Sequence, residues 1–347
     1  MSNRWPGGLI RKTPVIPAGP YEDSAAPGVW TLAEAAYWKK QGLWPTRGNI
    51  APPPLSGDVA VFAGQQFSAS AARLEYINIA TTSNSGDFAD LLNQYGGYGS
   101  CASTTRGLFA GQVVTSSNVI QYITILTKGN AIDFGDLTIA REYLGGCNST
   151  TRGIFSPSQG TYAERNVIDY VTIASTGNAT DFGDTTIYAY NSCSCSSQTR
   201  GLIAITGNSG GNQNTINYVT IASTGDATDF GDLTLSRQNV ASCSSATRGL
   251  FAGGVISNVS QNVIDYVTIA SAGNATDFGD LTAATRAAAG ASSATRGVFI
   301  NGYTTTTVNT ISYVTIASTG NAVDFGDSTI NQYQMAAVSN ANGGVQP

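Results

Sequence analysis

The length, composition and charge of the chain limit what it can be. Its 347 residues, 41% of them hydrophobic, suffice for one large domain with an appendage. The formal net charge of −5 argues against nucleic-acid binding, and the lack of histidine removes the commonest catalytic base and metal ligand. No apolar run reaches the ~18 residues of a membrane-spanning helix, so we expect no membrane insertion.

The first fifty residues differ in composition from the rest. They contain all four tryptophans, and their net positive charge contrasts with the acidic remainder. Thr31 and Glu34 form a capping box and Gly42 is a stop signal, which together predict one helix at about residues 32–41. Residues 51–56 follow as a proline-rich linker.

Two interpretations of residues 1–50 are open. The segment could pack on the surface of its own chain, or it could be an arm that docks on another protein through large apolar anchors. The candidate anchors are Trp5, Leu9, Ile10, Trp30, Trp38, Leu43 and Trp44. A secretory signal is not expected, because tryptophan and proline stand near the start, where such a signal has a long apolar core.

From residue 57 onward the sequence repeats. A D-F-[GA]-D block begins at Asp87, Asp133, Asp181, Asp229, Asp277 and Asp324. A T-R-G motif recurs with the same step, at Arg106, Arg152, Arg200, Arg248 and Arg296. A period in this range is typical of the blades of a β-propeller, where each repeat supplies one four-stranded sheet.

One repeat, residues 235–280, reads as four strands, with Gly273-Asn274 as a hairpin signal between the third and fourth. The third strand has apolar residues on both faces, as expected when blades stack face to face. Val59–Gly64 reads as a second strand with no first strand before it, and residues 330–345 align with the missing one. We therefore predict an all-β, six-bladed propeller over residues 57–347, closed by its C-terminal strand.

The motifs within one repeat resemble those of kelch proteins. The resemblance lies in an arginine, then [LI]-F-A-G-G, V-x-Y and an aromatic-x-x-L, although phenylalanine replaces the usual tryptophan. The near-identity of the copies, the D-F-G-D block and the leader "RWPGGLI" are similar to kelch-like virion proteins of tailed bacteriophages, of the tail or fibre type.

That resemblance implies a structural protein without enzymatic activity or cofactor. The protein would be made in the host cytoplasm and exposed on the virion surface. Its N-terminal arm would contact other virion proteins, and its propeller would contact a host-surface glycan or protein. Two alternatives remain: an architectural virion component, such as a capsid decoration or tail connector, and a kelch-fold enzyme, which the lack of histidine disfavours.

The repeated charges favour a structural role. The T-R-G arginines and the aspartate pairs suggest an Arg–Asp bridge or aspartate-to-backbone bonds in every blade. Paired carboxylates can also act as acid and base or bind calcium. Six equivalent copies argue for architecture, so we expect no catalytic or metal site. The aspartates of the last five blocks are Asp133, Asp136, Asp181, Asp184, Asp229, Asp232, Asp277, Asp280, Asp324 and Asp327.

Four cysteines share one register of successive inner strands, Cys101, Cys147, Cys195 and Cys243, and Cys193 is an extra. Their neighbours are small residues, as the crowded axis of a propeller requires. A free cysteine behaves as a small buried hydrophobe, and we expect no structural disulfide here.

The connections between strands two and three and between strands four and one vary most among the repeats. Both should lie on one face of the propeller. They are rich in tyrosine and arginine, which can stack on and hydrogen-bond sugars or proteins, although ordinary loop solvation is the alternative. The candidates are Tyr95, Tyr98, Arg141, Tyr143, Tyr162, Arg165, Tyr188, Tyr190, Arg237, Arg286, Tyr303 and Tyr333.

Overall fold

The computed structural model describes residues 55–65, 73–92, 95–113, 116–159 and 165–341, together with Ala33, Ala36, Tyr37 and Lys40. The chain divides into two units, Met1–Pro54 and Leu55–Pro347. The four residues described in the first unit are helical and exposed, in agreement with the helix expected at about residues 32–41. The seven candidate anchors and most of the linker lie outside the described residues.

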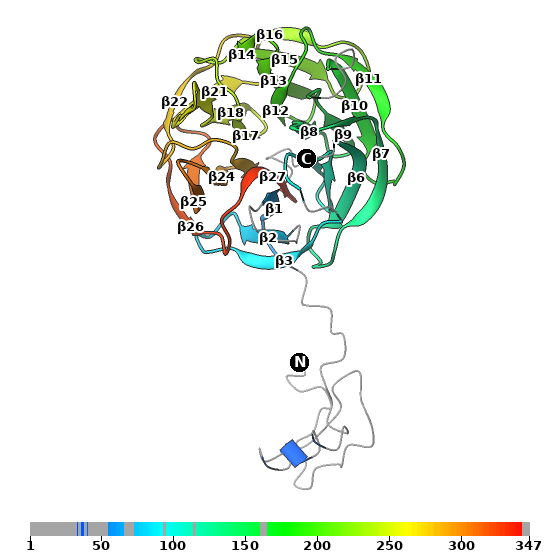
Figure 1. Cartoon of the computed structure of the whole chain (residues 1–347), viewed down its shortest axis with the longest axis vertical. Helices are drawn as coiled ribbons and strands as arrows, with labels where there is room; N and C mark the ends of the chain where they lie inside the picture. Colours follow the sequence, from blue (N-terminus) through cyan, green and yellow to red (C-terminus); the bar gives the residue numbers. More distant parts are fainter. Residues whose placement is uncertain are drawn as a thin grey trace. The chain divides into compact units, whose positions relative to one another are not determined.

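The second unit is a ring of six four-stranded antiparallel blades (Figure 1). From the axis outward, the first three blades are β27 (Tyr333–Ser339), β1 (Val59–Gln65), β2 (Arg73–Asn78), β3 (Gly86–Asp90); β4 (Gly99–Ala102), β5 (Arg106–Ala110), β6 (Ser117–Thr124), β7 (Ile132–Arg141); and β8 (Gly146–Asn148), β9 (Arg152–Phe155), β10 (Val167–Thr172), β11 (Thr180–Asp184). The other three are β12 (Asn191–Ser196), β13 (Arg200–Asn208), β15 (Thr215–Thr220), β16 (Thr228–Asp232); β17 (Ala241–Ser244), β18 (Arg248–Ala252), β21 (Val263–Thr268), β22 (Thr276–Asp280); and β23 (Ala289–Ser292), β24 (Arg296–Tyr303), β25 (Thr307–Thr315), β26 (Val323–Asp327). Three two-residue strands, β14 (Gly211–Asn212), β19 (Val255–Ile256) and β20 (Val259–Ser260), lie in connections between second and third strands.

The predicted closure of the ring is confirmed. β27, from the C-terminal end of the described chain, pairs antiparallel with β1 and becomes the inner strand of the first blade. Val61 lies opposite Val338 in this pairing, and both belong to one buried cluster. The ring is thereby closed by strand pairing, with no open sheet edge between the first and last blades.

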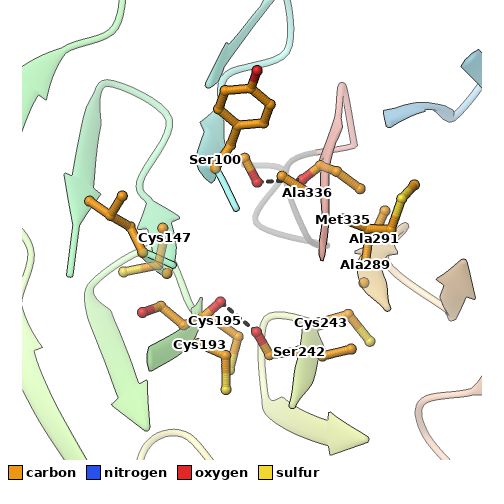
Figure 2. A pocket seen from close by; sticks show the side chains of 18 of the residues that line it. Ser100, Cys147, Cys193, Cys195, Ser242, Cys243, Ala289, Ala291, Met335 and Ala336 are labelled. Atoms are coloured by element: carbon orange, nitrogen blue, oxygen red, sulfur yellow. Dashed lines mark hydrogen bonds between the residues drawn. The ribbon is translucent and has the colours of Figure 1, made fainter. Parts of the chain in front are cut away.

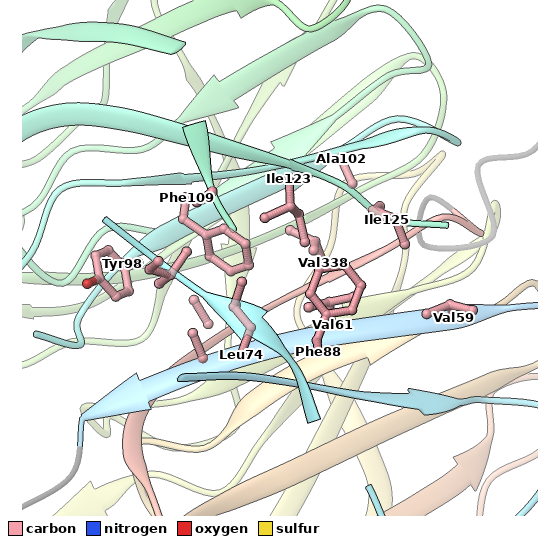
Figure 3. Close-up of a cluster of buried hydrophobic side chains, with 14 residues drawn as sticks. Val59, Val61, Leu74, Phe88, Tyr98, Ala102, Phe109, Ile123, Ile125 and Val338 are labelled. Atoms are coloured by element: carbon pink, nitrogen blue, oxygen red, sulfur yellow. The ribbon is translucent and has the colours of Figure 1, made fainter. Parts of the chain in front are cut away.

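The hydrophobic core lies between the blades. One cluster joins Val61 and Leu74 of the first blade to Phe109 and Ile123 of the second (Figure 3), and five similar clusters complete the ring. Each third strand has apolar residues on both faces of its sheet, as predicted, because a neighbouring blade covers each face. On each blade the third-strand tyrosine meets the fourth-strand phenylalanine edge to face, at centroid distances of 5.9 to 6.3 Å.

The third and fourth strands pair as a hairpin, as predicted, but Gly273-Asn274 does not form the tight turn between them. The third and fourth strands of this blade are joined by seven residues, 269–275, which reach across to the preceding blade. The Gly273 N–H donates to the Phe230 carbonyl over 2.7 Å, and the Asp232 N–H donates to Asn274 Oδ1 over 3.1 Å. Gly231 has φ +142°, and a Cβ there would lie 2.6 Å from the Gly273 backbone, so only glycine fits.

This contact is repeated around the ring and is called the outer latch below. At every junction the second residue of the D-F-[GA]-D aspartate pair exchanges two hydrogen bonds with the next blade. The N–H of this aspartate donates to an Asn or Asp side chain of the next blade. Its carbonyl accepts from the backbone N–H of the residue that follows that Asn or Asp. The last latch joins Asp327 to Asn84 and Ser85, so the last blade is bonded to the first at the periphery of the ring as well as at its axis.

Candidate functional site

The T-R-G arginines are structural, but not in the form of an Arg–Asp bridge. Each guanidinium donates to a main-chain carbonyl at the end of the third strand of the next blade, as Arg200 does to Ile269 over 2.9 Å. The acceptors of Arg106, Arg152, Arg248 and Arg296 are the carbonyls of Ile173, Ile221, Ile316 and Ile79. Each of the five also lies 4.5 to 4.7 Å over the third-strand tyrosine of its own blade.

The repeated aspartates act largely through their backbone. The first aspartate of each block is exposed, while the second makes the outer latch with its N–H and carbonyl. Asp181 also accepts from the Gly183 N–H over 3.1 Å, the aspartate-to-backbone bond expected from the sequence. Burial, with Asp226 and Asp181 nearby, raises the pKa of Asp184. The described residues contain no group of three or more His, Cys, Asp or Glu side chains placed to hold a metal ion.

The cysteines fill space between blades. All five are buried free thiols, and burial raises the pKa of Cys147, Cys193 and Cys243 to about 12. A Cβ added at Gly201 would lie 2.8 Å from Cys147 Sγ, and Cys101, Cys195 and Cys243 face the T-R-G glycine of the next blade in the same way, so these four sulfurs occupy the place that the glycines leave free. At one junction Ala60 and Ala291 take the registers of that glycine and that cysteine, which keeps the volume of the pair similar.

Two candidates for the binding face are buried ion-pair partners instead. Arg141 and Arg237 are fully buried and bind Asp169 and Asp265 of the following blade, with 3.0 Å between Arg237 Nη1 and Asp265 Oδ2. Asp265 Oδ1 also accepts from the Thr234 hydroxyl over 2.6 Å. Both arginines therefore hold neighbouring blades together and are not available to an external partner.

Sequence reasoning missed the third-strand register that supplies the aspartates bound by these two arginines. The six blades carry Glu75, Gln121, Asp169, Asn217, Asp265 and Ser312 in this register, and all are buried. Acids thus alternate with neutral residues around the ring. The signal was present, since each buried arginine stands 28 residues before its aspartate.

The acid at the closing junction lacks an arginine in the matching register. Glu75 accepts from the hydroxyls of Thr329 and Ser85, and Gln332 stands where Arg141 and Arg237 stand in their repeats. Burial raises the pKa of Glu75. The Gln332 side chain is also fully buried, and neither of its polar atoms has a hydrogen-bond partner in the described structure.

The two variable connections do lie together, as predicted. The backbone of the connection between strands four and one pairs with that between strands two and three at Glu142 and Gln159, Gln238 and Val255, and Arg286 and Tyr303. One register of this face, called the rim position, is occupied by Gly96, Glu142, Tyr190, Gln238, Arg286 and Tyr333. The six blades therefore carry five different residue types at one register of the repeat, since only tyrosine occurs twice.

The rim position surrounds the mouth of a central cavity of about 160 Å³. The next residue in each repeat lines this mouth: Gly97, Tyr143, Asn191, Asn239, Ala287 and Gln334. Below them the walls are small inner-strand residues (Figure 2), tied between blades by serine hydroxyls, as Ser100 donates to Ala337 and Ser242 to Ser194. Of the wall side chains, the Ser194 hydroxyl is buried without a partner in the described structure.

Aromatic and cationic side chains gather beside the mouth at the blades that contain β24 and β27. The Arg286 guanidinium lies 4.7 Å from the centre of the Tyr303 ring, and the Tyr303 and Tyr333 ring centres are 6.3 Å apart. The adjoining rim residue Gln334 donates from Nε2 to the Tyr143 hydroxyl over 2.9 Å. All five side chains are partly exposed.

The remaining candidates are scattered over the same face. Arg165 lies 4.1 Å over Tyr190, and Tyr95 and Tyr188 are exposed. Tyr98 is buried, which raises its pKa and removes it from the surface. Tyr162 lies outside the described residues.

The comparisons with known proteins add no family. No protein-family model matches the chain, and a search of curated proteins found no match. No helix among the described residues is long and apolar enough to cross a membrane.

Proposed function

We propose that the protein is a non-enzymatic structural component of a tailed-bacteriophage virion. It would be associated with the tail or its fibres, attached through residues 1–50, and would present the propeller for contact with a glycan or protein of the host surface. The observation that carries the proposal is the contrast at the rim position, where an otherwise repeated frame displays Glu142, Tyr190, Gln238, Arg286 and Tyr333.

A display role explains why the contacts between blades, called the frame below, are uniform. The outer latches, the T-R-G arginines and the serine bonds at the axis use the same geometry from blade to blade. A binding face built on such a frame can change its side chains without disturbing the contacts that hold the ring together. Tyrosine and arginine on this face are side chains that commonly anchor binding interfaces.

The central cavity supports binding rather than catalysis. Its walls are mostly serine, alanine, glycine and cysteine, and burial raises the thiol pKa to about 12 at Cys147 and Cys243. Thiols of this kind stay protonated at neutral pH and are poor nucleophiles. The aspartates of the D-F-[GA]-D blocks and the acids of the third strands do not line the cavity, and the acid beside its mouth is Glu142.

Two measurements test the proposal. Antibody labelling or a density map of purified particles should locate the chain on the tail, and added full-length protein should block adsorption of those particles to their host. A variant with Trp30→Ala and Trp38→Ala should fold normally but be missing from particles. Presence on the capsid or at a tail joint, with no effect on adsorption, would support the architectural alternative instead.

A further inference from the structure

We propose that Arg286, Tyr303 and Tyr333 form a binding site for a carboxylate-bearing pyranose, the acidic sugar unit of a surface glycan. The site lies beside the mouth of the central cavity, which the adjoining residues Ala287 and Gln334 line, at the junction of the last two blades and the first. The inference rests on the proposed function for the source of the glycan, but the chemistry of the site is argued from its own contacts.

Arg286 differs from every other arginine that the structure describes. Arg73, Arg141 and Arg237 pair with aspartates, and the T-R-G arginines donate to carbonyls. Arg165 has a further interaction of its own. Among the described residues, only the Arg286 guanidinium has a tyrosine face beneath it and no hydrogen-bond acceptor. A guanidinium carries five N–H donors in a planar fork that matches a carboxylate, so a bound carboxylate would complete it.

The charge around Arg286 suits an anionic ligand. Its neighbours in the rim position are Gln238 and Tyr333, which are uncharged, and the acidic rim residue Glu142 stands at the opposite blade of the ring. A ligand carboxylate would therefore lie at Arg286, while the acid Glu142, next to Tyr143, borders the site on the opposite side of the mouth. Attraction at a partly desolvated arginine is stronger than between groups in open water.

The two tyrosines supply the surface that a sugar ring requires. Tyr303 and Tyr333 are tilted by 57° at a centroid distance of 6.3 Å, so they present two aromatic faces that are not parallel. Burial raises the pKa of Tyr333, so its hydroxyl stays neutral and can both donate and accept. A pyranose places a C–H face on an aromatic ring, and its hydroxyl groups need hydrogen-bond partners. The Tyr143 hydroxyl and the Gln334 amide are further polar groups near the site.

The same geometry disfavours an acidic peptide. A peptide that joins a sheet needs an edge with free backbone groups. Here the N–H and carbonyl of Arg286 are bonded to those of Tyr303, at 3.0 and 2.9 Å. Gly302, with φ +112°, permits this pairing, because a Cβ there would lie 2.7 Å from the Arg286 carbonyl oxygen. The side chains, and not the backbone, are therefore what the site presents.

An array of immobilised oligosaccharides tests the inference with the full chain. Oligosaccharides that contain glucuronic, galacturonic or sialic acid are placed beside their carboxyl-reduced counterparts. The parent protein should bind at least one acidic glycan, and reduction of its carboxyl groups or the substitution Arg286→Gln should weaken binding roughly tenfold or more, as expected for loss of a charge-assisted bidentate contact. Tyr303→Ala should weaken it as well.

Lys128→Gln is the matched control, because Lys128 also lies over a tyrosine, Tyr76, at 4.4 Å, but in the connection between a third and a fourth strand and not on the variable face. It should bind acidic glycans like the parent, and near-parental melting of all variants shows that they are folded. The inference is overturned if no acidic glycan is retained or if Arg286→Gln binds like the parent. If the protein still blocks particle adsorption in that case, the proposed function stands. A protein receptor is identified if blocking persists after periodate treatment of the host cells but is lost after protease treatment of them.

Discussion

The outer latches and the rim position are two regions built from the same repeat, but the latch contacts are the same in every blade while the rim residue differs between blades. At the latch, Asp232 binds Asn274 and Ala275 through main-chain groups, and the equivalent bonds occur at each junction. At the rim, one backbone geometry carries Glu142 in one blade and Arg286 in the opposite one. The difference shows that the backbone and a few side chains hold the ring together, which leaves the rim side chains free to vary.

The largest effect should come from breaking the frame at its closure. Deletion of residues 330–347 removes β27, which pairs with β1 and supplies Ala336 and Val338 to the core. The first blade would then expose a sheet edge and two core layers would open, so we expect no cooperatively folded monomer. Circular dichroism melting of the purified chain checks this.

Truncation after Ala341 is the control for that experiment, because it keeps β27 whole. It should melt like the parent. A cooperative transition at the parental temperature after deletion of residues 330–347 would show that closure by β27 is dispensable.

The next effect should come from the buried ion pairs. Arg237→Ala leaves the carboxylate of Asp265 buried without its cation, and we expect a loss of about 3–5 kcal/mol in the free energy of unfolding. Arg286→Ala, at the rim, should change it by less than about 0.5 kcal/mol. Urea unfolding measures both, and equal losses would remove the distinction between frame and rim.

A smaller effect should follow from overfilling the junction. A Cβ at Gly201 would lie 2.8 Å from Cys147 Sγ, so Gly201→Ala should cost about 1–3 kcal/mol. Adding Cys147→Ala should restore most of that loss, since Ala60 and Ala291 already occupy these registers at another junction. A double-mutant cycle measures the coupling, and purely additive losses would contradict the packing explanation.

The smallest effect should be a pH dependence at the closing junction. Glu75 has a pKa raised by burial above its ordinary value of 4.5, so the folded state binds this proton more tightly than the unfolded state. Its contribution to stability is therefore greatest at low pH and falls as pH rises through the folded-state pKa. Glu75→Gln should remove that fall.

The control for Glu75 is the neighbouring register residue Gln121, whose side chain accepts from the Leu92 N–H over 2.6 Å without a charge. Gln121→Asn should leave the shape of the pH profile unchanged. If the difference in unfolding free energy between the parent and Glu75→Gln were constant from about pH 4 to pH 8, Glu75 would not titrate differently on folding.

Much of the fold could be predicted from the sequence, because the repeat transfers every inference from one blade to five others. The period gave the blade count, and the complementary ends of the repeat region gave the pairing of β27 with β1. The outer latch could not be predicted, because Gly273-Asn274 has the local signature of a hairpin while its partners lie about one repeat earlier.

The candidate site was predictable in location but not in membership. The variable connections do share a face, yet Arg237 points into a junction and the register of Arg286, one residue later in the repeat, forms the rim. Composition cannot separate adjacent positions that face opposite ways. The acidic third-strand residue Asp265 was the sequence signal that would have assigned Arg237 to the frame.

One measurement tests the separation of frame and binding face most directly. A full-length variant in which Glu142, Tyr190, Gln238, Arg286 and Tyr333 are all replaced by alanine should be compared with the parent for its ability to block particle adsorption to host cells. We predict a melting temperature close to that of the parent and loss of blocking. Blocking equal to that of the parent by a folded variant would contradict the account, because the face that varies would then not be the face that binds.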